Sequence, residues 1–157
     1  MSVGKGDVIE DFELPDQHGV PRRLSELLGG GPVVLFFYPA AMTTGCTAEA
    51  CHFRDLAAEF ATIGAQRVGI SRDPVDRQRR FAEKHDFDYP LLSDTDGSVA
   101  AALGVKRKLP LGPLSHRRMT FVIDTDRTIL DVIHDERDMN QHADRALSVL
   151  DAHRRTI

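Results

Sequence analysis

The sequence predicts an α/β fold in which a mixed central sheet is flanked by helices. Val33–Tyr38 is a continuous apolar run of strand length, which is typical of a strand buried on both faces. After it, strand and helix patterns alternate, and the last two strand segments flank a turn at Asp124–Arg127, which indicates an antiparallel hairpin. The length of 157 residues corresponds to one domain, residues 1–157.

The individual elements follow from short patterns along the chain. Strands are predicted at Val33–Tyr38, Gln66–Ile70, Tyr89–Leu92, Met119–Ile123 and Thr128–Ile133. Helices are predicted at Thr47–Ile63, Arg77–His85, Ser98–Leu103 and Asn140–His153. The segment Lys106–His116 contains two prolines and a glycine, so we expect a surface loop there.

Composition and charge argue against several classes of protein. The net charge of −4 and the isoelectric point of about 5.9 argue against a nucleic-acid partner. No apolar run approaches the ~18–20 residues that cross a bilayer. The first residues, MSVGKGDVIEDFELPD, lack the apolar stretch of a signal peptide. We therefore expect a soluble cytoplasmic protein that does not bind membranes.

The two cysteines, Cys46 and Cys51, are the most informative feature of the chain. They are too few for a secreted disulfide framework, and in a reducing compartment a close pair is typical of catalysis or metal binding. No C-x2-C or H-x3-H spacing completes a tetrahedral zinc set, so no metal is expected. The structural alternative is that both thiols are buried as small hydrophobic side chains.

Cys46 is predicted to lie at the start of a helix. The buried strand ends near Tyr38, a short loop follows, and a helix begins close to Cys46. Unpaired backbone N–H groups and the positive end of the helix dipole favour an anion at that place. A thiolate is such an anion, and we predict that Cys46 is the nucleophile.

Cys51 follows in the same predicted helix, and this placement limits how the two thiols can meet. In an ideal helix, positions i and i+5 are about 7.5 Å apart along the axis and about 140° apart around it, so their Cα atoms are roughly 8.7 Å apart. A disulfide needs Cα atoms within ~7 Å of each other. We hypothesise that Cys51 resolves oxidised Cys46 and that the first turns of the helix unwind to allow it.

The residues around the cysteines resemble the peroxiredoxin active-site motif, Pro39-x-x-x-Thr43-x-x-Cys46. The second cysteine after four intervening residues, within GCTAEACHFRD, is similar to the bacterioferritin comigratory protein or peroxiredoxin Q subfamily. Further similar segments, GDVIEDFELPDQHG, VVLFFYP and RMTFVID, extend the resemblance over nearly the whole chain. It implies a thioredoxin-like fold and thiol-dependent reduction of hydrogen peroxide and organic hydroperoxides, with no cofactor.

The resemblance also implies the cycle of the two cysteines. Cys46 would be the peroxidatic cysteine and Cys51 the resolving one, and oxidation would pass through a sulfenic acid to an intramolecular disulfide. A thioredoxin-like reductant would restore both thiols. A monomer is favoured, although an exposed apolar face could pair two copies.

Four further residues match the motif and inherit roles from it. Thr43 would hydrogen-bond the peroxide, and Pro39 would shield the thiolate from water. Arg118 would stabilise the thiolate and the leaving oxygen, and Glu49 would orient Arg118. Arg117 adjoins Arg118, and strand alternation sends the two side chains to opposite faces, so that only one of them can point at Cys46; the motif register favours Arg118.

The same residues also fit other interpretations. Thr43 or Thr44 could cap the helix. Glu49 lies near the start of the helix and could serve only to interact favourably with the helix dipole. Arg118 could be a charge in a structural ion pair. At the level of function, a thiol–disulfide oxidoreductase could share the fold, although the C-x-x-C motif of such enzymes is absent. A non-enzymatic redox-sensing or chaperone-like scaffold is the second rival.

Overall fold

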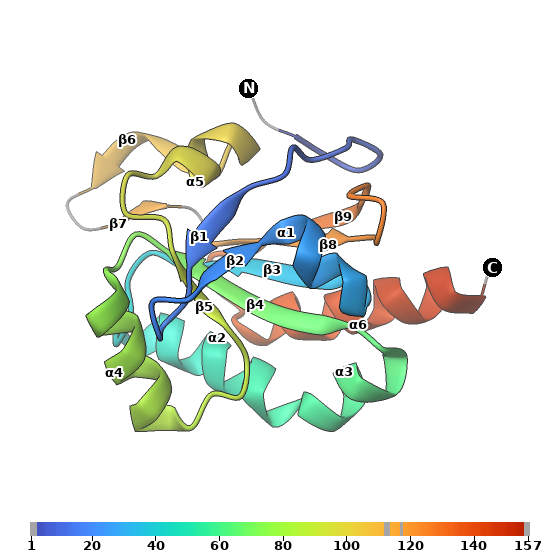
Figure 1. Ribbon diagram of the computed structural model, residues 1–157, viewed down its shortest axis with the longest axis horizontal. Coiled ribbons are helices and arrows are strands. Elements are labelled where there is room, and N and C mark those ends of the chain that lie inside the picture. Colours follow the sequence, from blue (N-terminus) through green and yellow to red (C-terminus); the bar gives the residue numbers. More distant parts are fainter. Residues whose placement is uncertain (1–2, 112–113, 117, 156–157) are drawn as a thin grey trace.

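A mixed five-stranded sheet forms the centre of the computed structural model, which describes residues 3–111, 114–116 and 118–155 (Figure 1). Its strands run in the order β5-β4-β3-β8-β9. Their bounds are Leu91–Ser93 (β5), Gln66–Ser71 (β4), Val33–Phe37 (β3), Met119–Ile123 (β8) and Ile129–His134 (β9). β3, β4 and β5 are parallel, whereas β8 is antiparallel to β3 and β9 is antiparallel to β8. The predicted mixed sheet is confirmed.

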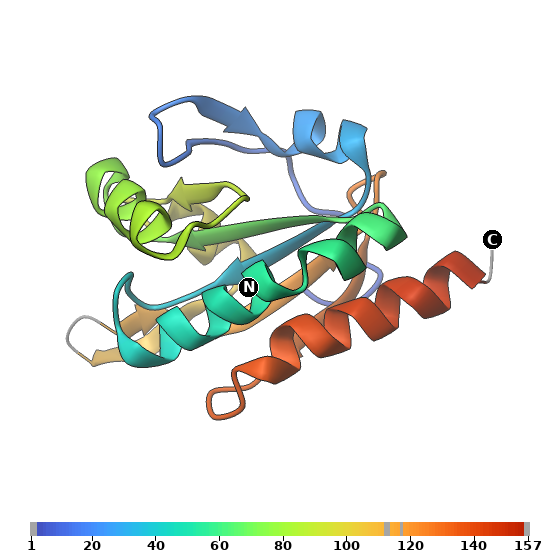
Figure 2. The same ribbon diagram turned by 90° about the horizontal axis from the view of Figure 1, so that it is seen from below.

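Helices cover both faces of this sheet. They are α1 (Leu24–Leu27), α2 (Thr44–Asp55), α3 (Ala57–Ile63), α4 (Val75–His85), α5 (Ser98–Leu103) and α6 (Asn140–Arg155), with a 3-10 turn, η1, at Leu28–Gly30. α2, α3 and α6 lie together on one face, and α1 and α5 lie on the other (Figure 1, Figure 2). α6 packs against β8 and β9 of the sheet and against α2 beside it.

All five residues of β3 are buried, because its side chains point alternately to the two faces of the sheet and both faces are covered. Val34 and Phe36 belong to the core under α2, α3 and α6. Val33, Leu35 and Phe37 belong to the second core, under α1 and α5. A strand that is covered on both faces must be apolar throughout, which is the pattern that the sequence carries.

The register of the sheet brings two segments that are distant in sequence together at one end of the strands. Phe37, the last residue of β3, pairs with Met119, the first residue of β8. Because these strands are antiparallel, the chain entering β8 runs beside the chain that leaves β3 for α2. The N-terminus of α2, with its unpaired N–H groups, therefore faces the segment that precedes β8.

The helix predicted at Thr47–Ile63 is two helices, which corrects the prediction. α2 ends at Asp55 and α3 begins at Ala57, because Leu56 (φ −95°, ψ 21°) leaves the helical region. The apolar periodicity continues across the break, since Phe53 and Phe60 enter the same core. Periodicity alone reports the buried face and not the continuity of the backbone.

Two hairpins were not predicted. The expected loop Lys106–His116 contains strands β6 (Lys106–Leu111) and β7 (Leu114–His116), which pair antiparallel with an irregular register. Proline is tolerated in edge strands, so the two prolines were not evidence against strands in this segment. Near the N-terminus, β1 (Glu13–Pro15) pairs with β2 (Pro21–Arg23), although both strands are only three residues long.

Candidate active site

Cys46 is the third residue of α2 and is fully buried, with a free thiol. The prediction that it lies in the first helical turn is confirmed. The first turn of α2 contains no acidic residue, so no carboxylate there competes with a thiolate for the unpaired N–H groups. An anion bound at this position would meet the positive end of the helix dipole.

The loop from β3 to α2 is held by residues that the sequence analysis did not single out. The N–H of Ala41 donates to Asp73 Oδ2 at 2.7 Å, and Arg77 Nη2 donates to the Ala41 carbonyl at 3.2 Å. Asp73 also pairs with Arg77 at 3.0 Å and accepts from the Ser71 hydroxyl at 2.6 Å. This network after β4 fixes the loop backbone ahead of Cys46. No motif marks Asp73 or Arg77, because the backbone that they hold, at Ala41, is distant from them in the sequence.

Pro39 and Thr43 lie in this loop, as the motif requires. Pro39 is buried and Thr43 is half-buried. The Thr43 hydroxyl donates to the Ala40 carbonyl at 2.8 Å, and it makes no capping hydrogen bond to α2. Since the hydroxyl hydrogen is engaged, the lone pairs of Oγ1 are free to accept a hydrogen bond.

Arg118 precedes β8 and is 9% exposed. The buried Thr120, two residues further, hydrogen-bonds His142 of α6, so strand alternation directs Arg118 to the face that carries α2. A Cβ atom built on Gly45 would lie 2.7 Å from Arg118 Nη2, so the guanidinium lies against the residue that precedes Cys46. Arg117 lies outside the described residues.

Gly45 is a further residue that the sequence alone did not single out. The same hypothetical Cβ would lie 3.4 Å from Arg118 Cζ and 3.7 Å from the sulfur of Met139. Any larger residue would therefore push the guanidinium away from the first turn of α2. The sequence does show a glycine one residue before the candidate nucleophile. Its role in making room for Arg118 could not be predicted, because Arg118 is distant in the sequence.

Glu49 lies one turn after Cys46 and is fully buried. Its Oε2 is 3.9 Å from Arg118 Nη1 and 3.5 Å from His142 Nε2. Burial raises the pKa of Glu49 to about 8; the Arg118 guanidinium opposes this rise and Glu136 adds to it. Desolvation thus outweighs the ion pair, and the carboxyl is mainly neutral at pH 7.

Cys51 lies in the second half of α2 and is half-buried, with a free thiol. Burial raises the pKa of the Cys51 thiol, while Arg54 lowers it and Asp55 raises it further. The intact helix keeps Cys51 on a different turn from Cys46, as predicted. The carbonyl of the neighbouring Ala50 accepts a 2.7 Å hydrogen bond from the buried Tyr89 hydroxyl, which ties this part of α2 to the chain before β5.

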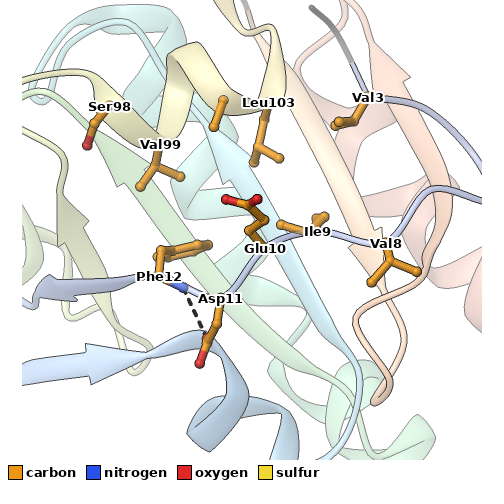
Figure 3. Close-up of a pocket in the computed structure, with 10 residues that line it drawn as sticks. Val3, Val8, Ile9, Glu10, Asp11, Phe12, Ser98, Val99 and Leu103 are labelled. Atoms are coloured by element: carbon orange, nitrogen blue, oxygen red, sulfur yellow. Dashed lines mark hydrogen bonds between the residues drawn. The ribbon is translucent and has the colours of Figure 1, made fainter.

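A pocket of about 490 Å³ lies away from this site, between the N-terminal segment and α5 (Figure 3). Its lining residues Ile9, Val99 and Leu103 belong to the second core, on the opposite face of the sheet from α2. Figure 3 shows the Glu10 and Asp11 side chains beside apolar ones, and none of the described lining residues is a cysteine, histidine, lysine or arginine. The described residues of this pocket therefore offer no group for thiol chemistry.

No helix in the described part of the chain combines the length and the apolar character needed to cross a bilayer. In the same residues, no three side chains of the His, Cys, Asp or Glu type are grouped so that they could hold a metal ion.

Residues 5–132 match the model of the AhpC/TSA family. The chain belongs to this family. The solved structure of peroxidoxin BcpB from Mycobacterium tuberculosis is 66% identical, with a TM-score of 0.90 over 96% of this chain and 97% of that one. Peroxiredoxin Bcp of Escherichia coli is 39% identical over 140 residues, which are 87% of this chain and 89% of the relative. The structure of the bacterioferritin comigratory protein of Xanthomonas campestris, described for its alkyl peroxide reduction activity, is 29% identical with a TM-score of 0.84 over 94% and 99% of the two chains.

These comparisons decide the fold and the class of activity. The thioredoxin-like fold and the resemblance to the Q and Bcp peroxiredoxins are confirmed. Peroxiredoxins are thiol-dependent peroxidases, and the predicted activity is confirmed at that level. The family thus acts on hydroperoxides.

Proposed function

We propose that Cys46 is the peroxidatic cysteine of this peroxidase and that Arg118 is the cation that assists it. The observation that carries the proposal is the arrangement of three groups: a buried thiol in the first turn of α2, a guanidinium packed against Gly45, and Glu49 behind that guanidinium. The helix N-terminus and the guanidinium both stabilise a thiolate. The same guanidinium stabilises the charge that develops on the leaving oxygen.

The first chemical step breaks the O–O bond of the hydroperoxide. The Cys46 thiolate attacks the terminal oxygen, an S–O bond forms, and the sulfur is oxidised to sulfenic acid while the peroxide is reduced. The leaving oxygen departs with the bonding electron pair and takes up one proton to become an alcohol, or water for hydrogen peroxide. In this proposal the Thr43 hydroxyl oxygen accepts a hydrogen bond from the bound peroxide, and the buried Pro39 keeps water from the thiolate.

The second step joins the two cysteines of one chain. The Cys51 thiol condenses with the Cys46 sulfenic acid, a disulfide forms, and one water leaves. Because the two residues lie on different turns of α2, the first turns of this helix must unwind before the sulfur atoms meet. The hydrogen bond from Tyr89 to the Ala50 carbonyl opposes that unwinding.

A thioredoxin-type dithiol completes the cycle by reducing the disulfide and becoming a disulfide itself. We propose hydrogen peroxide and organic hydroperoxides as substrates, because the family acts on hydroperoxides and the loop before α2 exposes an apolar side chain, Met42. We further propose that the whole chain acts as one domain, as a monomer and in the cytoplasm. An intramolecular disulfide needs no second copy, and a reducing compartment suits a catalytic thiol pair.

Mass spectrometry after one equivalent of hydrogen peroxide tests the proposal. The expected product has lost two hydrogen atoms and contains a disulfide between Cys46 and Cys51. The Cys51→Ser variant is expected to stop at the sulfenic acid of Cys46, and the Cys46→Ser variant to consume no peroxide. A protein that ignores peroxide but exchanges with protein disulfides would instead be the oxidoreductase rival. Turnover that survives Cys46→Ser would remove Cys46 from the chemistry.

A further inference from the structure

Behind Arg118 lies a fully buried carboxyl–imidazole pair, Glu49 of α2 and His142 of α6, that the thiol chemistry described above does not use as a pair. The same atom, Glu49 Oε2, faces His142 Nε2 at 3.5 Å and Arg118 Nη1 at 3.9 Å. Neither oxygen of Glu49 has a hydrogen-bond partner among the described residues, and neither has Arg118 Nη1. An ionised carboxylate in such surroundings is poorly solvated.

The orientation of the His142 ring is fixed at both nitrogens. Nε2 lies 2.8 Å from the Asp135 carbonyl, which can only accept, so Nε2 carries a hydrogen. Nδ1 lies 2.7 Å from the Thr120 hydroxyl, which donates to it when the ring is neutral. The positive end of the Nε2–H bond is thereby held near Glu49 Oε2.

We propose that Glu49 is a proton-holding group behind Arg118 and that His142 is the residue that positions it and sets when the proton is lost. While Glu49 keeps its proton, the guanidinium charge serves Cys46 and the leaving oxygen. Once Glu49 is ionised, its carboxylate competes for that charge. This inference rests on the proposed roles of Cys46 and Arg118.

The charges around the pair agree with this assignment. Burial raises the pKa of Glu49 to about 8, and burial lowers the pKa of His142, so the ring is neutral and the carboxyl holds one proton near pH 7. Charge and hydrogen-bond partners reach the pair from all the elements that pack around it. They are Arg118 and Thr120 at β8, Asp135 and Glu136 between β9 and α6, and the neutral phenol of Tyr89 before β5.

Loss of the Glu49 proton has a defined kinetic consequence. In the step proposed above, negative charge moves from the Cys46 sulfur to the leaving oxygen, and Arg118 must stabilise both. Removing a donor of this kind outright costs about 10²–10³ in rate. A guanidinium that remains but is shared with a carboxylate should cost about tenfold. The rate of peroxide attack should therefore fall on the alkaline side of pH 8.

The test is the pH profile of the second-order rate constant for oxidation of the reduced protein by hydrogen peroxide, from about pH 5 to pH 9.5. The wild-type rate should fall about tenfold between pH 7 and pH 9.5. In Glu49→Gln, which is neutral at every pH, the plateau should continue without this fall. In His142→Phe, which removes the N–H beside Oε2, the midpoint of the fall should move to higher pH by at least about half a unit.

Conservative replacement and matched controls separate positioning from general damage. His142→Gln keeps an N–H donor near the Nε2 position and should return the midpoint to that of the wild type. His18→Gln and Glu59→Gln alter exposed residues of the same types and should leave the profile unchanged. A fall that persists in Glu49→Gln, or a His142→Phe midpoint equal to that of the wild type, would overturn the inference. A wild-type protein inert to peroxide at every pH would overturn the proposed function instead.

Discussion

Replacing Gly45 by alanine should slow the peroxidase without destabilising the fold. The added Cβ would lie 2.7 Å from Arg118 Nη2, and ordinary contact begins near 3.4 Å, so the guanidinium must withdraw by about 0.7 Å. Misplacing a reacting group by about 1 Å can cost about 10²-fold in rate. We therefore expect peroxide attack on Cys46 to slow by roughly ten- to a hundredfold. Alanine is also the better helix former, by about 0.8–1 kcal/mol in a helix interior, so the free energy of unfolding should stay constant or rise.

The assay combines two measurements on the same variant. Stopped-flow oxidation by hydrogen peroxide gives the rate, and urea unfolding gives the stability. Gly29→Ala is the matched control, because a Cβ there meets no atom within 4 Å, and it should leave the rate unchanged. A Gly45→Ala rate within twofold of the wild type would refute the argument that Arg118 must lie against the first turn of α2.

The contacts of Arg118, Tyr89 and Glu49 each predict a measurable effect. Arg118→Ala should slow peroxide attack by about 10² or more in the stopped-flow assay, and a rate within twofold of the wild type would exclude Arg118 from the site. Tyr89→Phe removes the donor to the Ala50 carbonyl and should speed disulfide formation after oxidation by about two- to tenfold, since such a bond contributes about 0.5–1.5 kcal/mol; an unchanged rate would show that this hydrogen bond does not limit unwinding. Glu49 has a folded pKa of about 8 and an ordinary value of 4.5, so the folded state binds more protons between these values and wild-type stability should fall as pH rises through that window. The loss should be on the order of a few kcal/mol, and Glu49→Gln should lack it in unfolding titrations at several pH values; equal slopes in both proteins would show that Glu49 ionises normally.

The sequence was most informative about features that depend on one short segment alone. The apolar run Val33–Tyr38 predicts a strand buried on both faces, and β3 has this property because cores lie on both sides of it. The cysteine spacing predicts that both thiols share one helix, and α2 contains both. These features depend on local periodicity and spacing, which a single sequence displays directly.

The sequence was less informative where a distant residue decides the geometry. Gly45 makes room for Arg118, and Asp73 holds the Ala41 backbone, but each pair is joined only through the sheet register. His142 comes next to Glu49 because α6 packs on α2, and nothing in its own segment indicates this. The short strands β1 and β2 escaped prediction because three residues show no usable periodicity.

The proposed mechanism requires that Cys46 attacks the peroxide bond as a thiolate. The most direct measurement is the ultraviolet absorbance of the thiolate during a pH titration of Cys51→Ser, followed by reaction of the same samples with hydrogen peroxide. The expected result is that the rate of sulfenic acid formation rises in parallel with the Cys46 thiolate absorbance as the pH is raised. A rate that does not follow the thiolate absorbance, or a Cys46 that does not react with peroxide at any pH, would show that the Cys46 thiolate is not the nucleophile.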